Sequence, residues 1–88
     1  MTYTIEILRS AQKQLSKIQQ RDQRHIIEHI RQLAQDPRPS RCKKLSGRPA
    51  WRIRVGVYRI IYEIHDEHLL VLVVTIGHRK EVYRLKPE

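Results

Sequence analysis

Cysteine is scarce in the sequence, and long apolar runs are absent. The single cysteine among 88 residues, Cys42, excludes an internal disulfide framework and a cysteine-based zinc site, and it favours a reducing, cytoplasmic setting. The longest uncharged run, Leu69 to Gly77, is much shorter than the roughly 20 residues needed to span a bilayer. The first residues carry Glu6 and no basic segment, which argues against a signal peptide. We therefore expect a soluble protein without a membrane partner.

Acidic residues are missing from a long central stretch. The chain has 18 Lys and Arg against 9 Asp and Glu, a net charge of +9, and no acidic residue occurs from Pro37 to Tyr62. Such a one-sided segment favours a surface that binds a polyanion, with added solubility as the alternative interpretation. The basic residues of this stretch are Arg38, Arg41, Lys43, Lys44, Arg48, Arg52, Arg54 and Arg59.

Signatures of several enzyme and metal-site classes are also absent. There is no glycine-rich phosphate loop and no sequence context for a nucleophilic serine. His25 and His29 have the spacing of two metal ligands on a helix, but no third ligand is visible near them. We expect neither a metal site nor a cofactor.

The hydrophobic pattern predicts one α+β domain over residues 1–88. A strand is predicted at 3–8, followed by two amphipathic helices with caps at Ser10 and Asp22. The proline-rich segment 37–49 is predicted to be an irregular connection. Three further strands are predicted at 51–55, 58–64 and 68–76.

The order β-α-α-β-β-β predicts an antiparallel helical hairpin packed on one face of a four-stranded, mainly antiparallel sheet. The last strand is apolar on both faces, so it should lie in the interior of the sheet. The helices have one sheet face as their apolar partner, and the opposite face should therefore stay partly open.

Arginines in the strand pattern point to a site on that open face. Arg52 and Arg54 share one face of their predicted strand because successive side chains alternate. Arg59 should join them from the next strand, as an exposed residue. Guanidinium groups offer fork-shaped donors and remain charged, so three of them on one surface would bind phosphate. Solubilising charge paired with Glu63 is the alternative interpretation.

A second cluster begins where the last strand ends. It combines His78, Arg79 and Tyr83 within a few positions. Histidine is suited to proton transfer near neutral pH, and tyrosine can donate a proton or stack on a base. A histidine at a strand end is by itself more often an ordinary surface residue.

Two segments resemble the RelE/ParE superfamily of bacterial and archaeal toxins, and more closely its RelE branch. They are Trp51–Tyr62, with the sequence WRIRVGVYRIIY, and Gly77–Tyr83, with the sequence GHRKEVY. Lys44–Gly47 also resembles the Lys-Leu-x-Gly stretch of that family. The likeness covers nearly the whole chain, and it implies a RelE/ParE-like fold.

The resemblance implies the toxin component of a toxin–antitoxin system, an endoribonuclease that cleaves messenger RNA in the ribosomal A site without a metal. In that reaction the ribose 2′-hydroxyl attacks the adjacent phosphate. The products are a 2′,3′-cyclic phosphate and a free 5′-hydroxyl. The implied partners are the ribosome, messenger RNA and a cognate RelB-like antitoxin, through which the complex would bind operator DNA.

The resemblance also implies roles for individual residues. Arg59 and Arg79 would clamp the scissile phosphate. Tyr83 and His78 would share proton transfer. An arginine stays protonated in proteins, so the strand arginines would orient RNA rather than act as a general base. The residues expected to hold the RNA are Arg52, Arg54, Lys43, Lys44, Arg48 and Lys80.

Two functions of other classes remain open at this point. A ParE-like inhibitor would bind DNA gyrase and would need no nuclease chemistry. A non-catalytic module would bind RNA with an affinity that falls as salt rises, and it would leave no cleavage product. The joint presence of His78, Arg79 and Tyr83 favours the ribonuclease.

Overall fold

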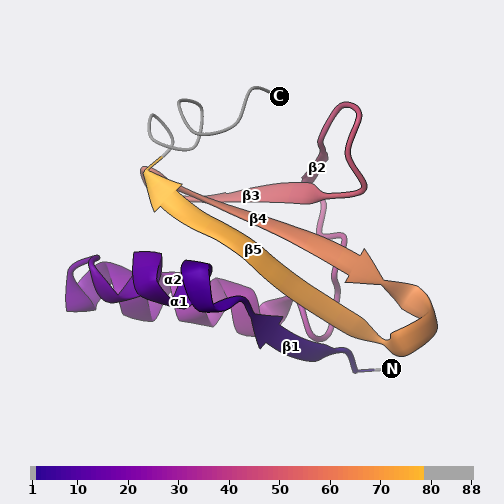
Figure 1. Ribbon diagram of the computed structural model, residues 1–88, viewed down its shortest axis with the longest axis horizontal. Helices are drawn as coiled ribbons and strands as arrows, with labels where there is room; N and C mark the ends of the chain where they lie inside the picture. Colours follow the sequence, from indigo (N-terminus) through magenta and orange to yellow (C-terminus); the bar gives the residue numbers. More distant parts are fainter. Residues whose placement is uncertain (1, 79–88) are drawn as a thin grey trace.

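The secondary structure confirms the predicted α+β fold and adds one strand. The computed structural model describes residues 2–78, and the predicted site residues Arg79, Lys80 and Tyr83 lie outside this part of the chain. A short 3-10 turn, Asp66–His68, joins the last two strands. Within residues 2–78 the helices and strands are β1 (Thr4–Ile7), α1 (Arg9–Ser16), α2 (Gln20–Gln32), β2 (Lys43–Lys44), β3 (Trp51–Val55), β4 (Tyr58–His65) and β5 (Leu70–His78) (Figure 1).

The sheet has the strand order β1-β5-β4-β3-β2. The first strand, β1, runs parallel to β5, and the other neighbours are antiparallel. The apolar strand β5 therefore lies between β1 and β4, which confirms its predicted interior position. The prediction of four strands was wrong by one, because two residues of the connection, Lys43 and Lys44, pair with Arg52 and Trp51 of β3. Two residues are too few to show a period in the sequence.

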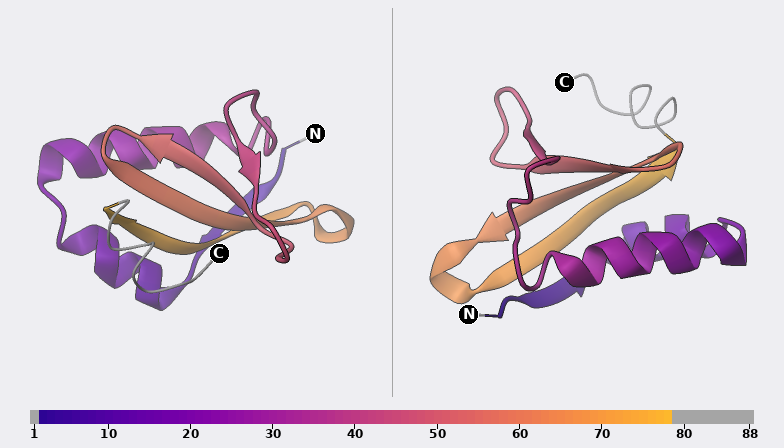
Figure 2. Two further views of the ribbon diagram at one scale, coloured as in Figure 1. Left: turned by 90° about the horizontal axis from the view of Figure 1, so that it is seen from above. Right: turned by 180° about the vertical axis from the view of Figure 1, so that it is seen from behind.

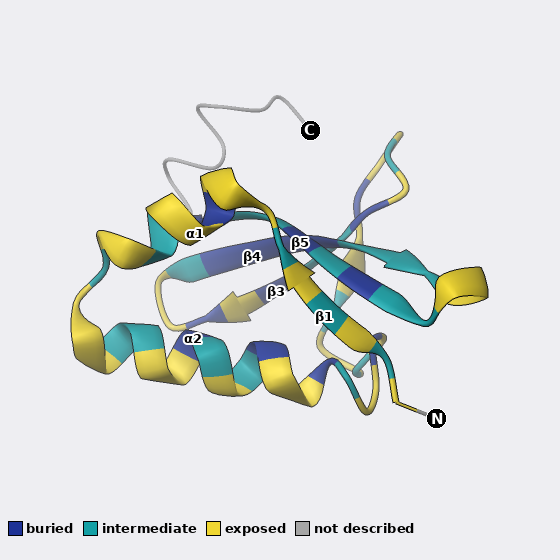
Figure 3. Cartoon of the chain, turned by 60° about the horizontal axis from the view of Figure 1, so that its bottom comes forward, coloured by how far each residue is buried: buried dark blue, intermediate teal, exposed yellow. Residues whose placement is uncertain are grey.

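The two helices lie on one face of the sheet, and no helix among residues 2–78 covers the opposite face, which we call the helix-free face (Figures 1 and 2). Figure 3 shows the buried residues of both helices on the side that faces the sheet. The main core joins the two layers through Ala11, Ile26, Ile30 and Leu33 of the helical layer and Ile53, Val55, Ile60, Tyr62, Val71, Val73 and Ile76 of the sheet.

The predicted helix caps are corrected by the structure. Leu8 and Gln19 occupy the cap positions, and neither side chain makes a capping hydrogen bond. Ser10 and Asp22 lie inside the first turns instead. A carboxylate in the first turn still favours the helix, since it faces the positive end of the helix dipole.

The β4–β5 ladder contains an irregularity that changes which face each residue occupies. Ile61 pairs with Thr75 and Tyr62 pairs with Val73, so Val74 is an extra residue on β5. Beyond this bulge the alternation of β5 is shifted by one position. Val73 before the bulge and Ile76 after it both belong to the core beneath the helices.

A small second core covers part of the helix-free face. It consists of Leu45, Ala50 and Ile61, with Val74 packed against them. The loop that follows β2 therefore shields one end of this face. In the part of the chain that the structure describes, no helix has the length and apolar character needed to cross a membrane.

Candidate functional site

Three arginines meet on the helix-free face of the sheet. Arg52 and Arg54 alternate along β3 with core residues that face the helices. Arg59 lies directly opposite Arg54 in the β3–β4 ladder. Cross-strand partners project from the same face, so the alternation in the sequence correctly predicted this grouping.

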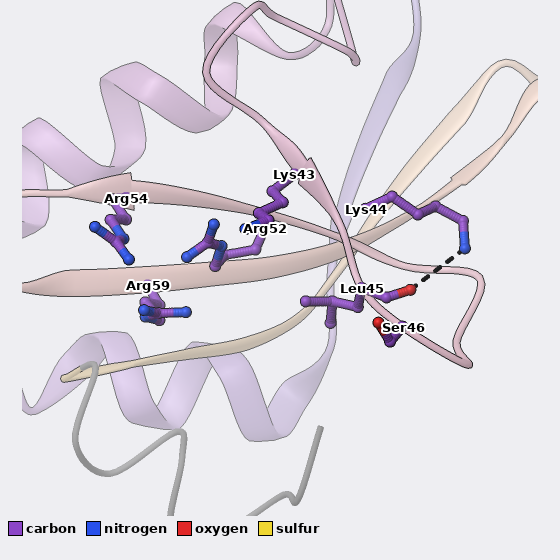
Figure 4. A pocket seen from close by; sticks show the side chains of 7 residues that line it. All are labelled: Lys43, Lys44, Leu45, Ser46, Arg52, Arg54 and Arg59. Carbon is purple, nitrogen blue, oxygen red and sulfur yellow. Dashed lines mark hydrogen bonds between the residues drawn. The ribbon is translucent and has the colours of Figure 1, made fainter.

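A hollow of about 240 Å³ lies over these side chains, and we call it the basic hollow. Figure 4 shows the side chains of Arg52, Arg54 and Arg59 along the two central strands. None of the described lining residues is acidic. The hollow therefore favours an anion over a cation. Its lining residues are Lys43, Lys44, Leu45, Ser46, Arg52, Arg54 and Arg59.

Arg59 lies at the floor of the hollow, and the prediction that it is exposed was wrong. The residue is 2% exposed. Its neighbours across the two ladders are Arg54 on β3 and Gly77 on β5, and the glycine contributes no side chain on that side. A glycine in a strand often marks a close approach of another group, so Gly77 is the feature of the sequence that could have indicated the burial of Arg59. A charge at a site with little water acts on an anion more strongly than an exposed one.

The lysines of β2 differ in where their charges lie. Lys43 pairs with Arg52 and shares its face, so it extends the basic hollow. Lys44 points away from the three arginines: its ammonium donates to the carbonyl oxygen of Leu45 at 3.4 Å (Figure 4). It also donates to the carbonyl oxygen of Arg48 at 2.8 Å. Its Nζ also lies 5.6 Å from the ring centroid of Trp51. The structure therefore gives Lys44 local contacts, and Arg48 does not line the hollow.

Other basic residues of the acid-free stretch lie apart from the hollow. Arg38 forms an ion pair with Asp66, with 2.8 Å between Nη2 and Oδ2. The hydrogen bonds from Arg38 and from the Tyr3 hydroxyl lower the pKa of the Asp66 carboxyl. The same bond to Asp66 raises the pKa of Tyr3. Arg41 lines a different surface depression, next to the end of α2.

His78 lies on the opposite side of the sheet from the arginines. It pairs with Tyr58, and their ring centroids are 6.1 Å apart in an edge-to-face arrangement. Both rings line a separate hollow of about 480 Å³ beside Lys17 and Asp22 of the helical layer. The expected grouping of His78 with Arg59 is thus corrected, because the bulge at Val74 places His78 on the helix side.

Together, the helical hairpin, the mixed sheet and the basic hollow on the helix-free face define a small toxin of the RelE/ParE type. Residues 5–83 match the family described as the ParE toxin of type II toxin–antitoxin systems, parDE. The chain is 32% identical over 89 residues to toxin RelG of Mycobacterium tuberculosis, covering 96% of this chain and 99% of that protein. The chain belongs to the RelE/ParE toxin superfamily and is the RelE-like toxin of a type II toxin–antitoxin system.

Solved structures agree with this membership. A chain of the toxin–antitoxin complex RelBE2 from Mycobacterium tuberculosis superimposes with a TM-score of 0.80 at 28% identity, covering 90% of this chain and 100% of that one. A chain of the archaeal RelE–RelB complex from Pyrococcus horikoshii gives a TM-score of 0.80 at 26% identity, with 90% and 97% covered. The resemblance in the sequence is confirmed.

Proposed function

We propose that the protein is an endoribonuclease that cleaves messenger RNA in the ribosomal A site and thereby inhibits translation. The observation that carries the proposal is the convergence of Arg52, Arg54 and Arg59 in a hollow whose described lining holds no acidic side chain. Guanidinium groups bind phosphate through paired hydrogen bonds, so this surface fits the backbone of an RNA strand.

The proposed reaction needs two proton transfers and a group that stabilises the charge on the phosphate. The 2′-oxygen forms a bond to phosphorus, the bond from phosphorus to the 5′-oxygen breaks, and one proton leaves the 2′-hydroxyl while another reaches the 5′-oxygen. Arg59 and Arg54 would donate hydrogen bonds to the non-bridging oxygens, where negative charge increases in the transition state. The arginines supply this charge themselves, so the proposed reaction requires no metal.

Proton transfer is proposed for the segment that follows β5. Tyr83 is the proposed acid or base, and Arg79 the proposed second clamp on the phosphate. Both positions lie outside the described residues. His78 lies on the helix side of the sheet and is left out of this mechanism.

The proposed partners follow from the same assignment. The matched structures from Mycobacterium tuberculosis and Pyrococcus horikoshii are toxin–antitoxin complexes. We propose a RelB-like antitoxin for this chain, with operator DNA contacted through the antitoxin. A net charge of +9 supports binding to the ribosome and its message, in the cytoplasm.

Mapping of cellular messages by primer extension after induction of the toxin tests the proposal. We expect cuts inside translated codons, in frame, that disappear with Arg54→Ala and persist with Arg41→Ala. Intact messages together with captured gyrase would instead support the gyrase inhibitor. RNA binding without any cleavage product at any dose would support the non-catalytic module.

A further inference from the structure

We infer that Asp66, Arg38 and Trp51 are positioning residues that hold β2, and with it Lys43, at the rim of the basic hollow. None of the three residues lines that hollow. The inference rests on the proposed function, since it assigns these residues a part in RNA binding. Its basis is a continuous series of contacts from the β4–β5 turn to β2.

The series begins at the 3-10 turn between β4 and β5. The two carboxylate oxygens of Asp66 accept hydrogen bonds from the two terminal nitrogens of Arg38, at 2.8 and 3.3 Å. The Tyr3 hydroxyl donates to Oδ1 of the same carboxylate at 2.6 Å. A paired geometry of this kind fixes the plane of the guanidinium as well as its position.

The oriented guanidinium then contacts the indole ring of β3. The guanidinium carbon of Arg38, Cζ, lies 5.0 Å from the ring centroid of Trp51. The ammonium of Lys44 lies 5.6 Å from the same ring, and Lys44 pairs with Trp51 in the β2–β3 ladder. Trp51 is therefore in contact with two cations, one from the connection before β2 and one from β2 itself.

The short strand β2 needs such support because its own ladder is minimal. Its two residues form two pairs with β3, and it lies at the edge of the sheet. On its C-terminal side, the amide of Leu45 donates to Ala50 at 2.9 Å. On its N-terminal side, the connection is held at Pro37, whose carbonyl accepts from the Tyr62 hydroxyl at 2.7 Å, then at Arg38, and then at Cys42, which packs against the main core and donates its amide to the Pro39 carbonyl at 2.9 Å. Loss of the Arg38 contacts would remove the middle one of these anchors and loosen the segment that leads to Lys43.

Whether RNA binding becomes weaker or stronger in a variant of Asp66 distinguishes a positioning role from a purely electrostatic one. Asp66→Ala removes a negative charge from a basic protein, so long-range electrostatics alone would strengthen RNA binding. Positioning predicts weaker binding, because one lysine leaves the rim. Glu67→Ala is the matched control: Glu67 is an exposed acid in the same turn and takes no part in these contacts. Arg38→Lys leaves the net charge unchanged but removes the paired geometry.

The experiment measures the affinity of each full-length variant for a non-cleavable single-stranded oligoribonucleotide across a salt series, together with the fluorescence of Trp51, the only tryptophan of the chain. We expect Asp66→Ala and Arg38→Lys to shift the Trp51 emission without RNA and to lose about one phosphate contact. Such a loss corresponds to a salt slope smaller by about 0.7, or roughly fivefold in affinity at about 0.1 M salt. Asp66→Glu, which keeps a carboxylate, should restore part of the affinity, and Glu67→Ala should not weaken binding.

Three results would overturn the inference. The first is an unchanged Trp51 emission in Asp66→Ala. The second is RNA affinity in that variant equal to or above that of Glu67→Ala, while the unchanged protein binds RNA. In the third, the unchanged protein itself fails to bind RNA, and the proposed function falls together with the inference.

Discussion

The Arg54–Arg59 pair predicts that a loss of function at the basic hollow will be accompanied by a gain in stability. The two arginines lie directly opposite each other on neighbouring strands. Like charges in this position destabilise a sheet by about 0.2–1 kcal/mol. Coulomb's law gives about 0.7 kcal/mol for two unit charges roughly 6 Å apart in water, and the burial of Arg59 makes this a lower limit for the repulsion.

Arg54→Thr is the change that tests this reasoning. Arg54 is exposed, so its removal opens no cavity, and threonine is well suited to a strand. We expect the free energy of unfolding to rise by roughly 0.5–1 kcal/mol, which corresponds to about 2–6 °C in Tm for a domain of this size. The gain should shrink in about 1 M NaCl, where the screening length falls to about 3 Å.

The assay pairs thermal unfolding with RNA binding and cleavage. Arg54→Thr should lose one phosphate contact, or roughly fivefold in affinity for single-stranded RNA at about 0.1 M salt. Arg41→Thr is the control, because it removes the same charge from an exposed position outside the hollow. A variant that is less stable than the unchanged protein, or one that cleaves RNA as well as the Arg41→Thr control, would refute the argument.

Three further predictions follow from contacts of the connection and of the turns. Tyr62→Phe should lower the free energy of unfolding by about 1–2 kcal/mol in urea titrations, because it removes the buried hydrogen bond to the Pro37 carbonyl. The hydrogen bonds of Arg38 and Tyr3 lower the pKa of Asp66 from its ordinary 3.8, so the carboxylate stabilises the folded state above that value, and the benefit is lost as the pH falls through the lowered pKa. The stability deficit of Asp66→Asn in urea titrations should therefore be present at neutral pH and shrink as the pH falls below the ordinary value. Gly56→Ala should cost about 1–2 kcal/mol by thermal unfolding, since the residue has φ +61° and an added Cβ meets no atom within 4 Å, which leaves backbone strain as the cause.

The order and type of the long elements could be predicted from the sequence because each one has a clear period. The alternation of β3 placed Arg52 and Arg54 on the face opposite Ile53, as the structure confirms. The apolar run of β5 correctly indicated an interior strand. These features depend on local side-chain periodicity, which a single sequence displays directly.

The short strand and the burial of Arg59 could not be predicted in this way. Lys43–Lys44 form a strand through pairing with β3, and a pair of lysines carries no strand signal of its own. The face of Arg59 followed from alternation, but its 2% exposure depends on its neighbours across the sheet, Arg54 and Gly77. Burial is a property of the assembled sheet, and period alone does not determine it.

The bulge at Val74 decides which side chains of β5 can reach the basic hollow. If the alternation of Val71 and Val73 continued unbroken, His78 would project from the helix-free face, beside Arg59. The extra residue reverses this phase, so Gly77 lies opposite Arg59 in the ladder and the His78 ring lies against Tyr58 on the helix side. The reversal has no clear signal in the sequence, because Thr75 is the only polar residue in the run from Leu69 to Ile76 and the strand shows no alternation that the bulge would interrupt. A glycine in place of the imidazole leaves room for the buried Arg59 guanidinium, and the reaction proposed above would take its proton donor from a group other than His78.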